Sequence, residues 1–317
     1  MTRYLLTRLA LALVTLWLLS ILVFLASQIL PGDVAAKILG PTADSRAIAS
    51  LNTQLGLDRP AAVRYFEFVG GFFRGDLGES YSLREPVGPI LSAATLNSLK
   101  LAMVAFVVVV PLAIGGGVLA ALKKGKPSDR VITTLGLAGV VVPEFVSGIV
   151  VLLIFGVWLK ILPVSASAPT GSGPLTQFKY LLLPSVPLIF VMFGYIARIT
   201  RAGTVEALNS DYVRTATLKG LKKSVIVRRH VLRNALPPTI TVVATQVGYL
   251  FGGLVVIEIL FNYKGIGLLI FNATRDKDFP LLASCVMAVG SIYLIFTLLA
   301  DLIYSLLNPR VRIGGSK

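Results

Sequence analysis

Three carboxylates interrupt the most apolar parts of this 317-residue sequence: Glu144, Glu258 and Asp301. An acid within an apolar helix is costly in lipid, and such residues commonly serve a route for ions or solutes. Glu144 follows Pro143 near the middle of its apolar run, so it can line such a route or pair within a helix bundle. Glu258 and Asp301 stand nearer the ends of their runs, which favours structural hydrogen bonding. The candidate pathway residues are Glu144, Gln246 and Glu258.

The sequence has few other residues that could form a metal, disulfide or nucleotide site. One cysteine, Cys285, and one histidine, His230, cannot form a disulfide within the chain or a zinc or haem site. No Gly-x-x-x-x-Gly-Lys-Ser/Thr loop is present to cradle nucleotide phosphates, since "KKGKPS" places Pro127 after its last lysine. We therefore predict no catalytic residue, no metal and no cofactor in this chain.

A basic segment, Ser210–Pro238, contrasts with the apolar chain around it and carries seven bases with one acid. Asp211 suits the N-cap of a short helix over Tyr212–Lys219, because its carboxylate can accept from free backbone N–H groups. Gly220 suits the position after the helix, where a left-handed residue is common. Eight helical residues are marginal in water, so this helix must pack on something.

A second helix is predicted over Val225–Leu236, with Ser224 as its cap and Pro237 and Pro238 closing it. Ala216 leaves a small face on the first helix, where another surface can approach. Scattered bases would suffice for a loop that only fixes membrane topology. Two capped helices with a glycine break favour a docking element for a cytoplasmic partner.

Membrane spans must hold these residues in place. The chain is 55% hydrophobic and 14% charged, whereas soluble domains carry about 25% charged residues. The net charge of +15 lies between apolar runs, which indicates a lipid membrane and no nucleic acid. Six runs can each cross a bilayer core of ~30 Å as helices: Leu9–Leu30, Leu99–Leu122, Val131–Leu159, Leu181–Ile199, Thr239–Leu260 and Leu281–Leu307.

The loop charges predict the orientation. With a cytoplasmic N-terminus, 18 of the 30 lysines and arginines fall on the cytoplasmic side, as the positive-inside rule requires. Both termini are then cytoplasmic. The predicted parts are a cytoplasmic N-terminus with the first span (1–30), an external loop (31–98), a five-helix membrane core (99–307) with a cytoplasmic loop (200–238), and a cytoplasmic tail (308–317).

Small residues recur four apart in two spans: Ala113, Gly117 and Ala121 in the second, Gly248 and Gly252 in the fifth. This spacing lets helix backbones approach closely. The sequence leaves open whether the neighbour belongs to this chain or to a second membrane subunit.

The motifs "DYVRTATLKGL" and "HVLRNALPP" resemble the coupling loop, or EAA loop, of the membrane subunits of ATP-binding-cassette (ABC) importers. They are most similar to the dipeptide/oligopeptide branch. Arg214-Thr215-Ala216 replaces the commoner Glu-Ala-Ala, and Asn308 replaces the commoner Asp of the terminal motif. Further similarities run along the chain in order: "LPGD", "LGLDRP", "GDLGES", "GGLVVIEILFNYKGIGLL", "DFP" and "DLIYSLLNPRVR".

This resemblance implies an all-α integral membrane protein of the inner membrane, with six transmembrane helices and a cytoplasmic coupling helix between spans four and five, like type I importers. It implies a second homologous permease subunit, two cytoplasmic ATPase subunits that use ATP and Mg, and an external substrate-binding protein. The cargo would be peptides or related small solutes. The residues implied to couple to the ATPase are Glu206, Asp211, Tyr212, Arg214, Thr215, Ala216, Lys219, Gly220 and Leu221.

An alternative is a proton-coupled secondary transporter, which the membrane carboxylates would suit. Such transporters are commonly built from inverted repeats, and none is visible here. An intramembrane enzyme would need a nucleophile with a base, or metal ligands, which the single histidine does not provide.

Overall fold

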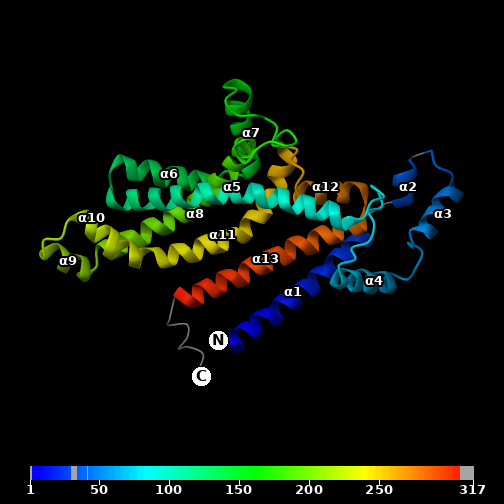
Figure 1. Cartoon of the computed structure of the whole chain (residues 1–317), viewed down its shortest axis with the longest axis horizontal. Helices are drawn as coiled ribbons and strands as arrows, with labels where there is room; N and C mark the ends of the chain where they lie inside the picture. The colour runs from blue at the N-terminus through cyan, green and yellow to red at the C-terminus, as the bar shows by residue number, and fades with distance from the viewer. Residues whose placement is uncertain (1, 30–33, 41, 308–317) are drawn as a thin grey trace. The chain divides into compact units, whose positions relative to one another are not determined.

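The computed structural model describes residues 2–29, 34–40 and 42–307, and within them the regular elements are helices (Figure 1). The "LPGD" motif at residues 30–33 and the tail at 308–317 lie outside this part. The helices are α1 (Thr2–Ile29), α2 (Val34–Leu39), α3 (Ser45–Gln54), α4 (Ala61–Arg74), α5 (Val87–Leu122), α6 (Pro127–Val141), α7 (Glu144–Val151), the π-helical η1 (Leu152–Trp158), α8 (Pro174–Leu208), α9 (Asp211–Leu218), α10 (Lys223–Ile226), the π-helical η2 (Val227–Val231), α11 (Leu232–Leu260), α12 (Ile266–Asp276) and α13 (Phe279–Leu307).

Among the described residues, five helices are long and apolar enough to cross a membrane: α1, α5, α8, the α10–α11 run and α13. A sixth span is reached if α6 and the α7–η1 helix count as one, although they are bent by 113° at their junction. The run predicted as the third span, Val131–Leu159, therefore consists of two helices that meet at this bend. Val142 is extended, with φ −76° and ψ 123°, because the ring of the following Pro143 disfavours helical geometry before it.

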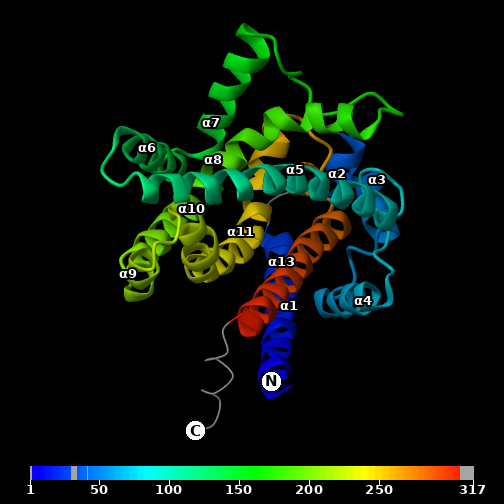
Figure 2. The same ribbon diagram turned by 60° about the vertical axis from the view of Figure 1, so that its left-hand side comes forward.

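The chain divides into two compact units, residues 1–99 with 262–294 and residues 100–261 with 295–317. In the first unit, α1 runs beside the first half of α13 (Figure 2). The contact is so close that a Cβ added at Gly290 would lie 2.5 Å from a methyl carbon of Leu19. Aromatic rings join these two helices and α4. Phe24 of α1 contacts Tyr65 of α4 and Phe279 of α13, each with ring centroids 5.4 Å apart.

A buried carboxylate ties the segment before α5 to the start of α13 within this unit. One oxygen of Asp278 accepts hydrogen bonds from the Ser80 hydroxyl at 2.5 Å, the Ser82 amide at 2.9 Å and the Ser82 hydroxyl at 2.7 Å. Ser80 ends the motif "GDLGES", and Asp278 begins the distant motif "DFP". Both motifs therefore contribute to the same hydrogen-bond network around Asp278.

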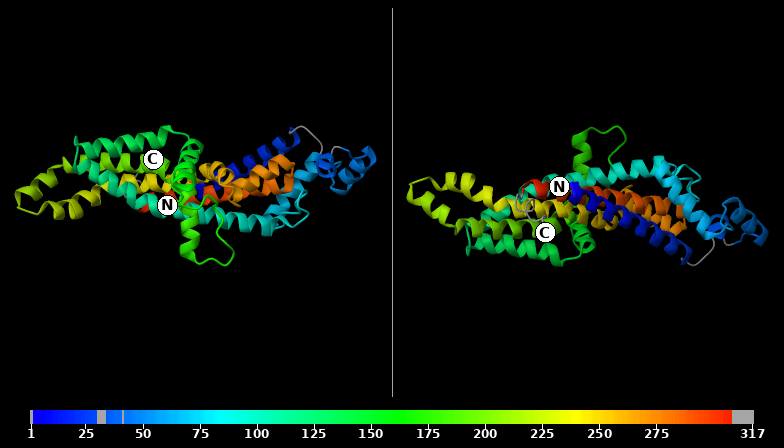
Figure 3. Two further views of the ribbon diagram at one scale, coloured as in Figure 1. Left: turned by 90° about the horizontal axis from the view of Figure 1, so that it is seen from above. Right: turned by 90° about the horizontal axis from the view of Figure 1, so that it is seen from below.

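In the second unit, glycines let α8 approach its neighbours (Figure 3). A Cβ at Gly117 of α5 would lie 2.6 Å from the carbonyl oxygen of Ala197, and one at Gly139 of α6 would collide with the carbonyl of Phe190. The small residues of the second span thus pack within the chain. Gly252 differs, since a Cβ there would meet nothing within 4 Å.

Candidate functional site

The short helix α9 begins one residue earlier than its sequence suggests. Ser210, in extended conformation, occupies the N-cap position, and Asp211 is the first helical residue. The prediction of Asp211 as the N-cap is therefore wrong. The Ser210 hydroxyl donates to the carbonyl of Ala207 at the end of α8, so it serves the preceding helix. Asp211 still lies in the first turn, where a negative charge favours the helix dipole.

Gly220 ends α9 as the sequence predicts, with φ +73°. Its N–H donates to the carbonyl of Thr217 at 3.0 Å, and the N–H of Leu221 donates to the carbonyl of Ala216 at 3.3 Å. These two bonds form a Schellman motif, which satisfies carbonyls that the helix end would otherwise leave free. The residue at this position needs the left-handed conformation that glycine adopts without strain.

One face of α9 is packed against its own chain. Val213 and Ala216 are buried in a cluster with Ala207 of α8, Ile226 of α10, Val231 of η2 and Ala235 of α11. The prediction that another surface approaches the small face at Ala216 is therefore confirmed, and that surface belongs to this chain itself. The cluster supplies the packing that an eight-residue helix needs in order to be stable.

The opposite face of α9 is exposed, and it includes a residue that the sequence analysis missed. The side chain of Leu218 is 81% exposed, the largest exposure of any apolar side chain on this segment. Tyr212, Arg214, Thr215, Lys219 and Leu221 are also exposed, as is Asp211. The sequence could have predicted this exposure. If Val213 and Ala216 face inward, Leu218, two residues after Ala216, must lie on the opposite side of the helix.

The helix that follows α9 does not end at Pro237 and Pro238. Ser224 is not a cap, since α10 begins at Lys223, and the helix passes through η2 and continues as α11 to Leu260. The predicted end at Pro237 and Pro238 is therefore wrong. Each proline removes one N–H from the helix ladder, but membrane helices tolerate this where side chains satisfy the backbone. The carbonyls that lose a backbone donor in this way are those of Arg233 and Asn234, four residues before the prolines.

Glu206 is exposed on the last turns of α8. Close by along the chain, Arg201 forms an ion pair that the sequence analysis did not foresee. Its Nε lies 2.6 Å from one oxygen of Asp129 and its terminal nitrogen 2.8 Å from the other, while the amide of Gly125 also donates to Asp129. This two-pronged pair holds the start of α6 to α8. Its partners are 72 residues apart in sequence.

The candidate pathway residues are only partly brought together. The Glu144 carboxylate, at the start of α7, lies against Gly253 of α11: a Cβ there would be 2.5 Å from Oε2. Gln246, two helical turns earlier, shares this face of α11 by helix periodicity. Its side chain is buried, and its Nε2 has no hydrogen-bond partner among the described residues.

Glu258 is fully buried, but it stands five positions beyond Gly253 and so faces about 140° away from it. A tyrosine of α11 lies near Glu144 instead and packs beside a tyrosine of α8. The rings of Tyr195 on α8 and Tyr249 on α11 have centroids 6.3 Å apart, and Tyr249 interacts electrostatically with Glu144. The structure thus groups Glu144 with one face of α11 and leaves Glu258 elsewhere.

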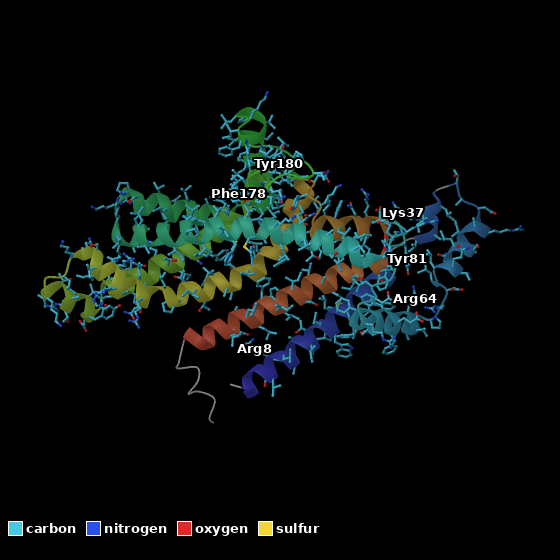
Figure 4. All side chains as sticks on the ribbon, viewed as in Figure 1. Arg8, Lys37, Arg64, Tyr81, Phe178 and Tyr180 are labelled. Atoms are coloured by element: carbon cyan, nitrogen blue, oxygen red, sulfur yellow. The ribbon has the colours of Figure 1, made fainter. Side chains whose placement is uncertain are left out.

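A separate hollow of about 230 Å³ lies in the first unit, near the Asp278 network. Arg64, Tyr81 and Phe279 are among the residues that line it, and Figure 4 labels the first two. Burial raises the pKa of the Tyr81 phenol above its ordinary value, so this group remains neutral. No predicted pathway residue contributes to this hollow.

Two family models cover nearly the whole sequence. Residues 1–112 match the N-terminal part of the binding-protein-dependent transport system membrane component, and residues 113–313 match the inner membrane component of the same systems. The chain belongs to this family. It is therefore a multi-pass inner membrane permease of a binding-protein-dependent ABC transport system.

Curated relatives match the permease along its full length. It is 34% identical over 309 residues to "Probable peptide ABC transporter permease protein y4tP" of Sinorhizobium fredii, covering 98% of this chain and 99% of the relative. It is 32% identical over 312 residues to "Glutathione transport system permease protein GsiC" of Escherichia coli K12, with the same coverage. These relatives give no support to the proton-coupled alternative.

One solved structure, described as an amino acid ABC transporter with histidines, aligns with 70% of the permease and 94% of its own chain. The TM-score is 0.49 and the sequence identity is 16%.

Proposed function

We propose that this permease forms the translocation pathway of an importer for peptides or related small solutes, paired with a second homologous permease. An external binding protein delivers the solute. Two cytoplasmic subunits bind ATP and Mg and hydrolyse the ATP, and this chain carries out no covalent chemistry itself. The cargo class rests on the printed functions of the relatives, which are a peptide transporter permease and a glutathione transporter permease.

The exposed face of α9 is the observation that carries the coupling role. Its inner side is fixed by the Val213–Ala216 cluster and its end by the Gly220 Schellman motif. A short helix that is fixed on one side and leaves Leu218 81% exposed on the other is suited to fit an apolar groove on a partner. In this proposal the α9 face docks on the ATPase and moves with it when ATP binds. The chain termini, α9 and Glu206 then lie on the cytoplasmic side.

Docking would bury most of the Leu218 side chain. Burial of a leucine side chain contributes about 1.5–3 kcal/mol, so Leu218→Ser should weaken ATPase binding about tenfold or more. Leu175, at the start of α8, is the matched control because its side chain is also 81% exposed. We expect Leu175→Ser to leave binding unchanged.

The experiment uses the complete transporter in proteoliposomes. Solute uptake and the ATPase activity stimulated by loaded binding protein are measured for both variants. The proposal predicts that Leu218→Ser lowers both activities while the permease stays in the membrane. Equal, unchanged activities for the two variants would contradict a docking role for this face of α9.

The cargo needs a separate measurement. The native binding protein is purified with its bound solute, and the solute is identified by mass spectrometry and then tested for competition in uptake. A peptide or a peptide-like thiol is the expected result. A sugar or an inorganic ion would contradict the proposed cargo class without affecting the coupling role.

A further inference from the structure

The helix α4 lies outside the apolar spans, yet it carries two aromatic surfaces. Its inner side packs through Tyr65 and Phe68 on Phe24 of α1 and Phe279 of α13. Its outer side presents Phe66, 70% exposed, and Phe73, 72% exposed. Such large exposed apolar groups at helical spacing require a partner surface.

The outer residues form one stripe. Val63, Phe66, Gly70 and Phe73 recur at spacings of three and four, which places them on a single face of the helix. Val63 is exposed as well, and a Cβ at Gly70 would meet nothing within 4 Å. The stripe is therefore open along its whole length in this chain.

The depth of α4 is fixed by its contacts with α1. The Tyr65 hydroxyl is hydrogen-bonded to the Ser20 hydroxyl at 2.9 Å. The apolar stretch of α1 runs from Leu6 to Ser27, so Ser20 lies about 10 Å inside its C-terminal end. Amphipathic helices that lie in a membrane interface are buried to about 5–10 Å.

The direction of α4 agrees with this depth. The helix runs across α1, not parallel with it (Figures 1 and 2). It lies by the C-terminal end of α1, whereas Arg8 marks the other end (Figure 4). Leu18, Leu22 and Leu25 of α1 are exposed, so the apolar outer surface of α1 reaches the level of α4.

We propose that α4 is an interfacial helix whose Val63–Phe73 stripe is inserted into the lipid leaflet at the C-terminal end of α1. The stripe contacts the lipid at the boundary between acyl chains and headgroups. Arg74 is exposed at the end of the helix, where it can reach lipid phosphates, whereas Arg59 before its start is ion-paired with Glu67. This inference does not depend on the cargo, on α9 or on the orientation of the chain.

The test is nitroxide labelling of the whole transporter in nanodiscs of phosphatidylethanolamine and phosphatidylglycerol. Phe66→Cys and Phe73→Cys are labelled in a Cys285→Ala background, and Glu67→Cys is the control. Glu67 is exposed and lies about 100° around the helix from Phe66. Accessibility is measured to oxygen, which concentrates in lipid, and to a nickel chelate, which stays in water.

We expect a gain in oxygen accessibility and a loss of nickel-chelate accessibility at Phe66 and Phe73 relative to Glu67. High nickel-chelate accessibility at both positions would show a water-facing stripe and overturn the proposal. Low accessibility to both reagents would show that another protein covers the stripe, which would also overturn it. Gly70→Cys provides a second probe that removes no phenylalanine, in case the first variants fail to assemble.

Discussion

Glu144 and Gly253 are packed so closely that the carboxylate of one occupies the space where a side chain of the other would begin. A Cβ at Gly253 would lie 2.5 Å from Oε2 and 2.8 Å from Oε1 of Glu144. The glycine thus allows an acid at the start of α7 to rest on α11. This contact joins the helix after the Pro143 break to the face of α11 that carries Gln246.

Gly253→Ala should displace the Glu144 carboxylate, which is the movable end of a flexible side chain, without preventing assembly. Both Gly253→Ala and Glu144→Gln should then change the uptake rate. Since they act through one contact, the double variant should differ from the sum of the single effects. The measurement is uptake in proteoliposomes at matched permease content.

Gly252→Ala is the control for this cycle, because a Cβ at Gly252 meets nothing within 4 Å. It should leave uptake unchanged. If Glu144→Gln instead fails to assemble and is degraded, the acid has a pairing role within the bundle, and its assignment to the pathway is wrong.

Gly220→Pro should uncouple the transporter. Proline fixes φ near −65°, whereas Gly220 has φ +73°, and it also removes the N–H that bonds to Thr217. A strained backbone site of this kind costs ~1–3 kcal/mol. The spans do not rely on this residue for burial, so membrane insertion should persist while uptake and stimulated ATPase activity are lost.

Gly171→Pro is a suitable comparison, since Gly171 has φ +82° and open space around it in the connector before α8. This variant should keep its coupled activity. Normal activity in Gly220→Pro would reduce the basic segment to a topology signal.

Asp129→Asn should destabilise the second unit by removing a charge that Arg201 contacts with two nitrogens. Loss of one member of a buried pair costs about 3–5 kcal/mol. The cost here should be smaller, because the Arg201 side chain is 29% exposed to solvent. The expected observation is a lower midpoint of thermal unfolding in detergent.

Arg201→Gln in combination with Asp129→Asn tests whether the two residues act as a pair. The double variant should be less destabilised than the sum of the single variants, since neither charge is then left without its partner. Strict additivity would show that the contact contributes little to stability.

Cysteine labelling should establish which side of the membrane each loop faces. Thr176 and Lys124 are both exposed, one at the start of α8 and the other between α5 and α6. In a Cys285→Ala background, Thr176→Cys should react with a membrane-impermeant thiol reagent applied to intact cells. Lys124→Cys should react only after the cells are opened. The reverse pattern would overturn the proposed orientation.

The sequence alone identifies most of the spans and the short helix of the basic segment, because these depend on local properties. Long apolar runs predict α1, α5, α8, α11 and α13 whatever they pack against. Gly220 is predictable for the same reason, since only its own backbone needs the left-handed conformation. The interruption at Pro143 is likewise a property of one residue and its neighbour.

The tertiary structure decides what distant parts of the chain do to these elements. Val213 and Ala216 face inward, and Leu218 outward, because the chain returns through Ile226, Val231 and Ala235 to cover one side of α9. Pro237 does not end its helix, since the apolar run after it continues as α11 to Leu260. The pairs Asp129–Arg201, Ser20–Tyr65 and Glu144–Gly253 likewise join residues on different helices. Hydropathy and capping describe neighbours along the chain, whereas these contacts are set by packing in three dimensions.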